Sequence, residues 1–106
     1  MMVDQNKSRV VSVRILVTGR VQGVGFRQAA RNQASKLGLV ATAINREDGS
    51  VLLETCGTRE AVDHFIAWAG RGPAMAVVTN VTVINMERPG MGSSLATSLG
   101  ETINGE

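Results

Sequence analysis

The chain has 106 residues, 43% of them hydrophobic and only three aromatic, so it can bury one small core of mainly aliphatic side chains. The single cysteine, Cys56, excludes an internal disulfide or a cysteine-only metal cluster and fits a reducing cytoplasm. The formal charge is only +2, no apolar run reaches the roughly 18 residues of a membrane helix, and residues 1–8 are polar. We therefore expect a soluble, cytoplasmic protein with no membrane partner.

Apolar and polar residues alternate over residues 10–18, which predicts a first β-strand. The next stretch, residues 19–27, reads Gly-Arg-Val-Gln-Gly-Val-Gly-Phe-Arg and leads into a helical pattern. Glycines allow the positive φ angles that turn successive N–H groups toward one point, and a helix N-terminus adds partial positive charge. Arg27 can add a planar fork of donors matched to phosphate oxygens. This junction is therefore predicted to bind an anion.

A helix is predicted over residues 26–37, where apolar side chains recur at helical spacing and Gly38 supplies the C-cap. Two strands should follow, over residues 39–45 and 50–56. Between them, Asp48-Gly49 is a pair suited to a hairpin turn. The hairpin would leave Asn45 at a strand end, beside the turn.

A second helix is predicted after Thr58, whose hydroxyl can cap its N-terminus. It should end within residues 70–73, and a last strand should run over residues 76–86. Four residues of this helix should face inward: Val62, Phe65, Ile66 and Ala69.

The element order β-α-β-β-α-β is typical of an α+β fold, the ferredoxin-like split βαβ sandwich. Both helices should cover one face of an antiparallel sheet. The domain is expected to span residues 9–87. Residues 1–8 and 88–106 show no sustained periodicity and are expected to be flexible termini.

Residues 19–27 closely resemble the phosphate loop of the acylphosphatases, G-[RK]-V-Q-G-V-x-[FY]-R. Residues 45–51, Asn-Arg-Glu-Asp-Gly-Ser-Val, are similar to the family's N-x-x-D-G-[ST]-V element, at its usual distance from the arginine. The resemblance covers about residues 11–83. It implies a monomeric enzyme without cofactor or metal, which hydrolyses small acyl phosphates to a carboxylate and inorganic phosphate.

The resemblance also implies roles for individual residues. Arg27 and the backbone N–H groups of the loop would hold the phosphoryl oxygens, and the amide of Asn45 would orient the attacking water. The catalytic residues would thus be Arg27 and Asn45, and the phosphate-binding loop would comprise Gln22, Gly23, Val24, Gly25, Phe26 and Arg27.

Two departures from the family pattern stand out. Where the family often shows G-W-V-[RQ]-N, this chain has Ala-Thr-Ala-Ile-Asn at residues 41–45, so Thr42 replaces a large aromatic near Asn45. The usual closing strand, F-x-[IV], has no clear counterpart; residues 97–103 offer only Leu99 and Ile103.

Other readings of the sequence remain open. A non-catalytic module that binds an anion or a carbamoyl-phosphate-like ligand is the main alternative. A metal or RNA module is disfavoured, because the chain lacks a C-x-x-C loop and base-stacking aromatics on its strands, so no nucleic-acid partner is expected. His64 is interpreted as a surface residue, Cys56 as a structural or incidental thiol, and Asp48 as a turn residue.

Overall fold

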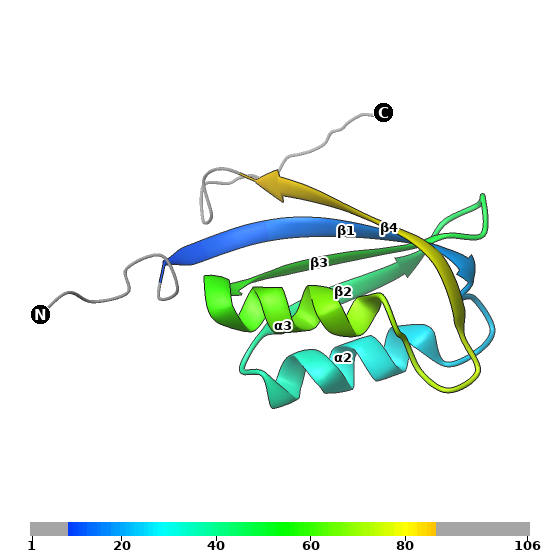
Figure 1. Cartoon of the computed structure of the whole chain (residues 1–106), viewed down its shortest axis with the longest axis horizontal. Helices are drawn as coiled ribbons and strands as arrows, with labels where there is room; N and C mark the ends of the chain where they lie inside the picture. Colours follow the sequence, from blue (N-terminus) through cyan, green and yellow to red (C-terminus); the bar gives the residue numbers. More distant parts are fainter. Residues whose placement is uncertain (1–8, 87–106) are drawn as a thin grey trace, which may run out of the picture.

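The computed structural model describes residues 9–86 (Figure 1). Two helices and four strands follow one another in the order predicted from the sequence, βαββαβ. The expected flexible termini, residues 1–8 and 88–106, lie outside the described residues. The elements are β1 (Val10–Arg20), α2 (Phe26–Lys36), β2 (Val40–Asn45), β3 (Val51–Thr58), α3 (Arg59–Ala69) and β4 (Val77–Met86).

The four strands form one antiparallel sheet in the order β2-β3-β1-β4. The strands β3 and β1 are central, and β2 and β4 form the edges within the described part of the chain. Both helices lie side by side on one face of this sheet (Figure 1). The predicted ferredoxin-like α+β sandwich is therefore confirmed.

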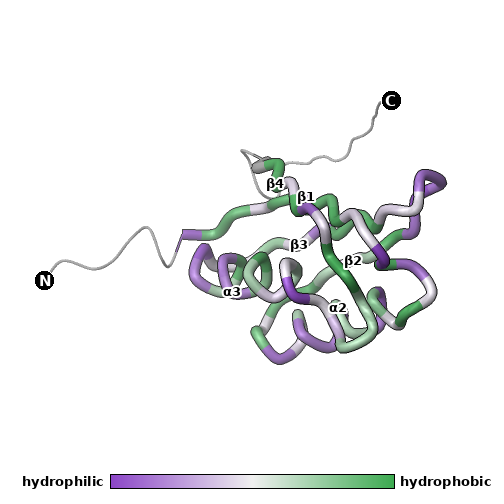
Figure 2. The backbone as a smooth tube through the Cα atoms, turned by 45° about the vertical axis from the view of Figure 1, so that its right-hand side comes forward, coloured by the Kyte–Doolittle hydropathy of each residue, from purple (hydrophilic) through white to green (hydrophobic). Residues whose placement is uncertain are grey.

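The core lies between the sheet and the two helices. In β1, the side chains of Val13, Ile15 and Val17 are buried on the helix-covered face, and each pairs with a buried residue of β3. Alternate residues of β1 point to the open face, because successive side chains of a strand project to opposite sides. Apolar residues recur along the strands, and polar residues recur in the turns and along both helices (Figure 2).

Each helix contributes a narrow apolar stripe to this core. The buried residues are Phe26, Ala30 and Ala34 in α2 and Val62, Phe65 and Ala69 in α3. Trp68 joins the two stripes, because its ring centroid lies 5.4 Å from that of Phe26 and 6.1 Å from that of Phe65. Ile66, expected to face inward, is only partly buried at the edge of the core.

The open face of the sheet carries an ion pair that the sequence analysis did not foresee. Arg14 of β1 and Glu54 of β3 are directly opposite each other, and Nε of the arginine lies 2.7 Å from Oε2 of the glutamate. Both side chains are 39% exposed. This arginine is thereby held on the face of the sheet away from the helices.

The strand β1 is two residues longer than the pattern predicts, because a β-bulge carries it past Thr18 to Arg20. The bulge depends on Gly19, which has a φ of 123°. A Cβ at this position would stand 2.1 Å from the carbonyl oxygen of Val77 in β4. Only glycine lets β4 stay paired with the end of β1, where the glycine-rich loop begins.

Gly19→Ala is expected to lower the free energy of unfolding by at least about 2 kcal/mol, since positive φ and a backbone clash act together. For a domain of this size the melting temperature should fall by roughly 10 °C. Gly38→Ala is the matched control: Gly38 has a φ of 76°, but no atom lies within 4 Å of the added Cβ. Equal losses of melting temperature in the two variants would show that the contact with Val77 does not constrain this strand.

Candidate active site

The connection between β1 and α2 takes its shape from two glycines. Gly23 and Gly25 have φ angles of 76° and 79°, in the left-handed region that favours glycine. No atom lies within 4 Å of the Cβ position of either residue, so backbone conformation and not crowding explains their presence. Gly25 is the N-cap residue of α2. The loop thus delivers the chain directly to a helix N-terminus that faces open space.

The N-terminus of α2 is not neutralised by its own residues. It has no side-chain hydrogen bond at the cap and no acidic residue in its first turn. The other helix, α3, has both: Oγ1 of Thr58 accepts a hydrogen bond from the N–H of Ala61 at 3.2 Å, and Glu60 lies in the first turn. Because first-turn N–H groups have no partner inside a helix, α2 presents donors and the positive end of its dipole. This end of α2 is suited to an anionic ligand.

Arg27 adds a full positive charge at the same place. It lies in the first turn of α2 and is exposed. Within residues 9–86 its guanidinium has no hydrogen bond or ion pair to another side chain, in contrast to the paired Arg14. The five donors of this planar group are available to a ligand.

Asn45 reaches the same region from the sheet. It is the last residue of β2 and pairs with buried Val51 of β3, so its side chain projects to the helix-covered face. Ala41 and Ala43 share that face and pack against the core. Their small side chains allow α2 to lie close over β2, which brings Arg27 and Asn45 to opposite sides of one hollow.

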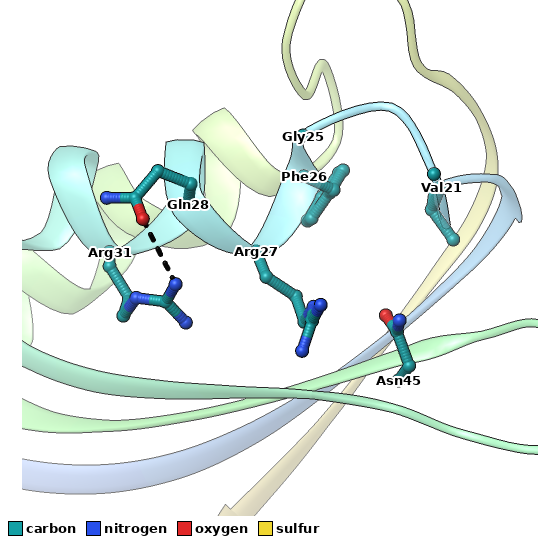
Figure 3. Close-up of a pocket in the computed structure, with 8 residues that line it drawn as sticks. Val21, Gly25, Phe26, Arg27, Gln28, Arg31 and Asn45 are labelled. Carbon is teal, nitrogen blue, oxygen red and sulfur yellow. Dashed lines mark hydrogen bonds between the residues drawn. The ribbon is translucent and has the colours of Figure 1, made fainter.

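The hollow is a pocket with a volume of about 300 Å³. Figure 3 shows the side chains of Arg27 from α2 and Asn45 from β2 extending into the same space. The lining residues are Val21, Gly23, Gly25, Phe26, Arg27, Gln28, Arg31 and Asn45. Both predicted catalytic residues and three further residues of the predicted loop thus meet at one site.

Two members of the predicted loop, Gln22 and Val24, do not line this pocket. Three residues that the sequence analysis missed do: Val21, Gln28 and Arg31. A signal was present for Arg31, because it follows Arg27 by four positions and residues so spaced share one side of a helix. Phe26 takes part through its backbone position, since its ring is buried against Trp68.

Thr42, which replaces the aromatic of the family pattern, lies on the other face of the sheet. It is exposed and pairs with Glu54, the partner of Arg14 on the open face. Asn45 points to the helix-covered face. The replacement therefore lies on the opposite face of the sheet from Asn45, as the alternation of strand residues predicts.

Gln22 has a different task from the rest of the loop. Its Nε2 donates hydrogen bonds to the carbonyl oxygens of Arg46 at 2.7 Å and Ser50 at 2.9 Å. These two residues also close the β2–β3 hairpin, where the N–H of Arg46 donates to the oxygen of Ser50 at 2.8 Å. Gln22 thus ties the loop that precedes α2 to the turn that follows Asn45.

The turn itself is held by Asp48. Its Oδ1 accepts hydrogen bonds from the hydroxyl of Ser50 at 2.5 Å and from the backbone N–H of Ser50 at 2.9 Å. These bonds, above all the one from the hydroxyl, lower the pKa of Asp48 below its ordinary value. A lowered pKa means that the turn gains stability from the carboxylate at neutral pH and loses it only in acid. Asp48 is explained by turn structure, as the sequence analysis interpreted it.

Gln22→Glu keeps the shape of the side chain but replaces the donor by an acceptor opposite two carbonyl oxygens. We expect the free energy of unfolding to fall by roughly 1–3 kcal/mol, from two hydrogen bonds of about 0.5–1.5 kcal/mol each. Urea denaturation measures this loss. Gln33→Glu, on a partly buried position of α2, is the control for charge alone. If Gln22→Glu lost no more free energy of unfolding than the control, the two hydrogen bonds of Gln22 would not be what holds the loop to the hairpin.

The remaining candidates of the sequence analysis lie elsewhere. His64 is exposed on α3, and Cys56 is exposed on the open face of the sheet; neither lines the pocket. The described residues include no cluster of three or more histidine, cysteine or acidic side chains suited to a metal ion. Among the helices described, none has the length and apolar character needed to span a membrane.

Fold and site together define a class of protein: a ferredoxin-like α+β domain whose first helix begins at a glycine-rich loop without a side-chain cap or an acidic residue in its first turn. A family model, described as acylphosphatase, matches residues 13–94. The chain therefore belongs to the acylphosphatase family and is an enzyme of that family, which confirms the resemblance found in its sequence.

Relatives named as acylphosphatases agree with this membership. An acylphosphatase of Methylococcus capsulatus is 47% identical over 74 residues, which are 70% of this chain and 80% of the relative. The solved structure of an acylphosphatase from Coxiella burnetii superposes with a TM-score of 0.71 at 30% identity, and covers 87% of this chain and 99% of its own. That of Bacillus subtilis also gives 0.71, at 33% identity over 79% of this chain and 94% of its own.

Proposed function

We propose that this enzyme hydrolyses small acyl phosphates at the pocket between α2 and β2. Arg27 and the N–H groups of the loop and first helical turn hold the phosphoryl oxygens, and the amide of Asn45 orients the attacking water. The products are a carboxylate and inorganic phosphate. Membership of the acylphosphatase family supports the reaction, and the geometry of the pocket supports the assignment of the residues.

One observation carries the proposal: the contrast between the two helix N-termini. The one at α3 is satisfied by Thr58 and Glu60, whereas the one at α2 has neither a cap nor an acid and has Arg27 beside it. A helix with an uncapped N-terminus and an unpaired arginine is less stable than it could be. A ligand with phosphate oxygens would satisfy both.

Hydrolysis of an acyl phosphate requires little beyond a site that binds the phosphoryl oxygens and positions a water molecule. An acyl phosphate has a good leaving group, so its hydrolysis requires positioning and neutralisation of charge more than a strong nucleophile. Donors fixed around the phosphoryl oxygens stabilise the charge of the transition state. The residues that line the pocket include no carboxylate and no histidine. We therefore assign the role of base to the phosphate of the substrate itself.

A non-catalytic module that binds an anion or a carbamoyl-phosphate-like ligand is the second candidate. The same loop and Arg27 would serve it equally well. Asn45 favours the enzyme, because its amide lines the pocket across from the end of α2 and would hold a water molecule against the phosphorus.

A steady-state assay with benzoyl phosphate, with and without a chelator, tests the proposal. We expect hydrolysis with inorganic phosphate as a competitive inhibitor, and equal rates in both arms, since the family resemblance implies no metal. Tight phosphate binding without turnover would favour the binding module instead. Loss of activity with the chelator would overturn the cofactor-free mechanism.

Three further expectations belong with this proposal. The domain is proposed to end near residue 87, the protein to act as a monomer, and its compartment to be the cytoplasm. Sedimentation of the purified chain in the presence of phosphate measures the oligomeric state directly. A dimer would contradict the proposed monomer.

A further inference from the structure

A second arginine lines the pocket beyond the group that holds phosphate. Arg31 follows Arg27 by one helical turn on α2, a rise of roughly 5.4 Å, and both line the same pocket. Figure 3 shows the two side chains on the same side of the helix. The proposed function uses Arg27 for the phosphoryl group and leaves Arg31 without a role.

The charge of Arg31 is not compensated by the residues around it. Its Nη2 donates to Oε1 of Gln28 at 3.2 Å, and Nε2 of Gln28 donates to Oδ1 of Asn32 at 3.1 Å. Both partners are neutral. Within residues 9–86 the ion pairs join Arg14 to Glu54 and Arg59 to Asp63, and none involves Arg31. Arg31 is exposed. Its hydrogen bond to Gln28 orients the side chain but does not compensate its positive charge.

If the phosphoryl group binds as proposed, Arg31 lies in the part of the pocket that is left for the acyl group. The phosphoryl group occupies the helix N-terminus and Arg27, so the acyl group must leave that point through the rest of the pocket. A short acyl chain or a benzene ring separates a terminal group from the phosphorus by several ångström, and the long side chain of Arg31 leaves α2 about one helical turn beyond Arg27. A guanidinium at that distance can form a bidentate pair with a second oxyanion.

We propose that the enzyme prefers acyl phosphates whose acyl group ends in an oxyanion, a carboxylate or a phosphate, and that Arg31 determines this preference. This inference rests on the proposed hydrolytic function and on the orientation it gives the substrate. Apart from Arg27 and Arg31, every side chain that lines the pocket is neutral and offers no comparable partner to an anion.

The test compares two substrates of nearly equal shape, 4-carboxybenzoyl phosphate and its neutral amide, 4-carbamoylbenzoyl phosphate. The measured quantity is the ratio of their kcat/KM values, in which differences of fold stability and of phosphate binding cancel. Arg31→Gln should lower this ratio roughly three- to tenfold, the effect of losing one partly exposed ion pair. Arg31→Lys, which keeps the charge, should retain more than half of the preference.

Lys36→Gln is the matched control, because it removes a positive charge from the last turn of the same helix, away from the pocket. It should leave the ratio unchanged. An equal ratio in Arg31→Gln and Lys36→Gln would overturn the role of Arg31 while hydrolysis itself continued. Failure of the unmodified enzyme to hydrolyse either compound would instead overturn the proposed function, and this inference with it. A third substrate, 4-phosphonobenzoyl phosphate, distinguishes a phosphate from a carboxylate as the preferred oxyanion.

Discussion

Arg27→Ala is expected to lower kcat/KM for benzoyl phosphate by roughly a thousandfold, about 4 kcal/mol of transition-state stabilisation. The guanidinium of Arg27 is a full positive charge in the first turn of α2, and charge on the phosphoryl oxygens must be neutralised for the reaction to proceed. Inhibition by inorganic phosphate should weaken in parallel. Steady-state kinetics with phosphate as inhibitor measures both effects.

The fold should survive this substitution, because Arg27 is exposed and has no side-chain partner within residues 9–86. Arg71→Ala, at an exposed arginine outside the pocket, is the control for loss of charge. Arg27→Lys should also fail, since an ammonium group cannot reproduce a bidentate contact. Turnover near that of the unmodified enzyme in either variant at Arg27 would refute the assignment of the phosphate site.

Asn45→Ala is expected to lower kcat roughly a hundredfold while the inhibition constant of inorganic phosphate changes by only a few-fold. In the proposed mechanism two different parts of the site bind the two reactants. The phosphoryl group is held by α2 and its loop, and the water is held by the amide of Asn45 at the end of β2. Comparison of kcat with phosphate inhibition separates the two tasks.

Asn80→Ala is a matched control on β4, where the side chain hydrogen-bonds Thr82 on the open face of the sheet. It should leave both quantities unchanged. If phosphate affinity collapsed together with turnover in Asn45→Ala, the amide would be holding the ligand or the loop rather than water.

Most of the fold was predictable because its signals are local. Alternation identified the strands, helical spacing and caps identified both helices, and Asp48-Gly49 identified the hairpin turn. The differences lie at element ends. β1 runs two residues beyond its predicted end because Gly19 forms a bulge against β4, a contact between segments distant in the sequence. No local pattern reports such a partner.

In the candidate site, too, some features were predictable from the sequence and others were not. Its central residues, Arg27 and Asn45, were identified by motif, and the structure places them at one pocket. The two hydrogen bonds of Gln22 could not be predicted, because their acceptors are backbone carbonyl oxygens of another loop. Every residue has such an oxygen, so no residue type in the sequence marks the acceptor. The ion pair of Arg14 with Glu54 depends likewise on the register of two strands.

The sequence alone determined the class of the protein, since the glycines of residues 19–27 and the order of elements are properties of neighbouring residues. Only the tertiary structure decided which side chains share the pocket. Side-chain direction follows from strand register and helix packing, which join segments far apart in the chain. For this reason the sequence could not show that Gln22 hydrogen-bonds the hairpin instead of lining the pocket. Nor could it show which of its several basic residues lines the pocket together with Arg27, which is Arg31.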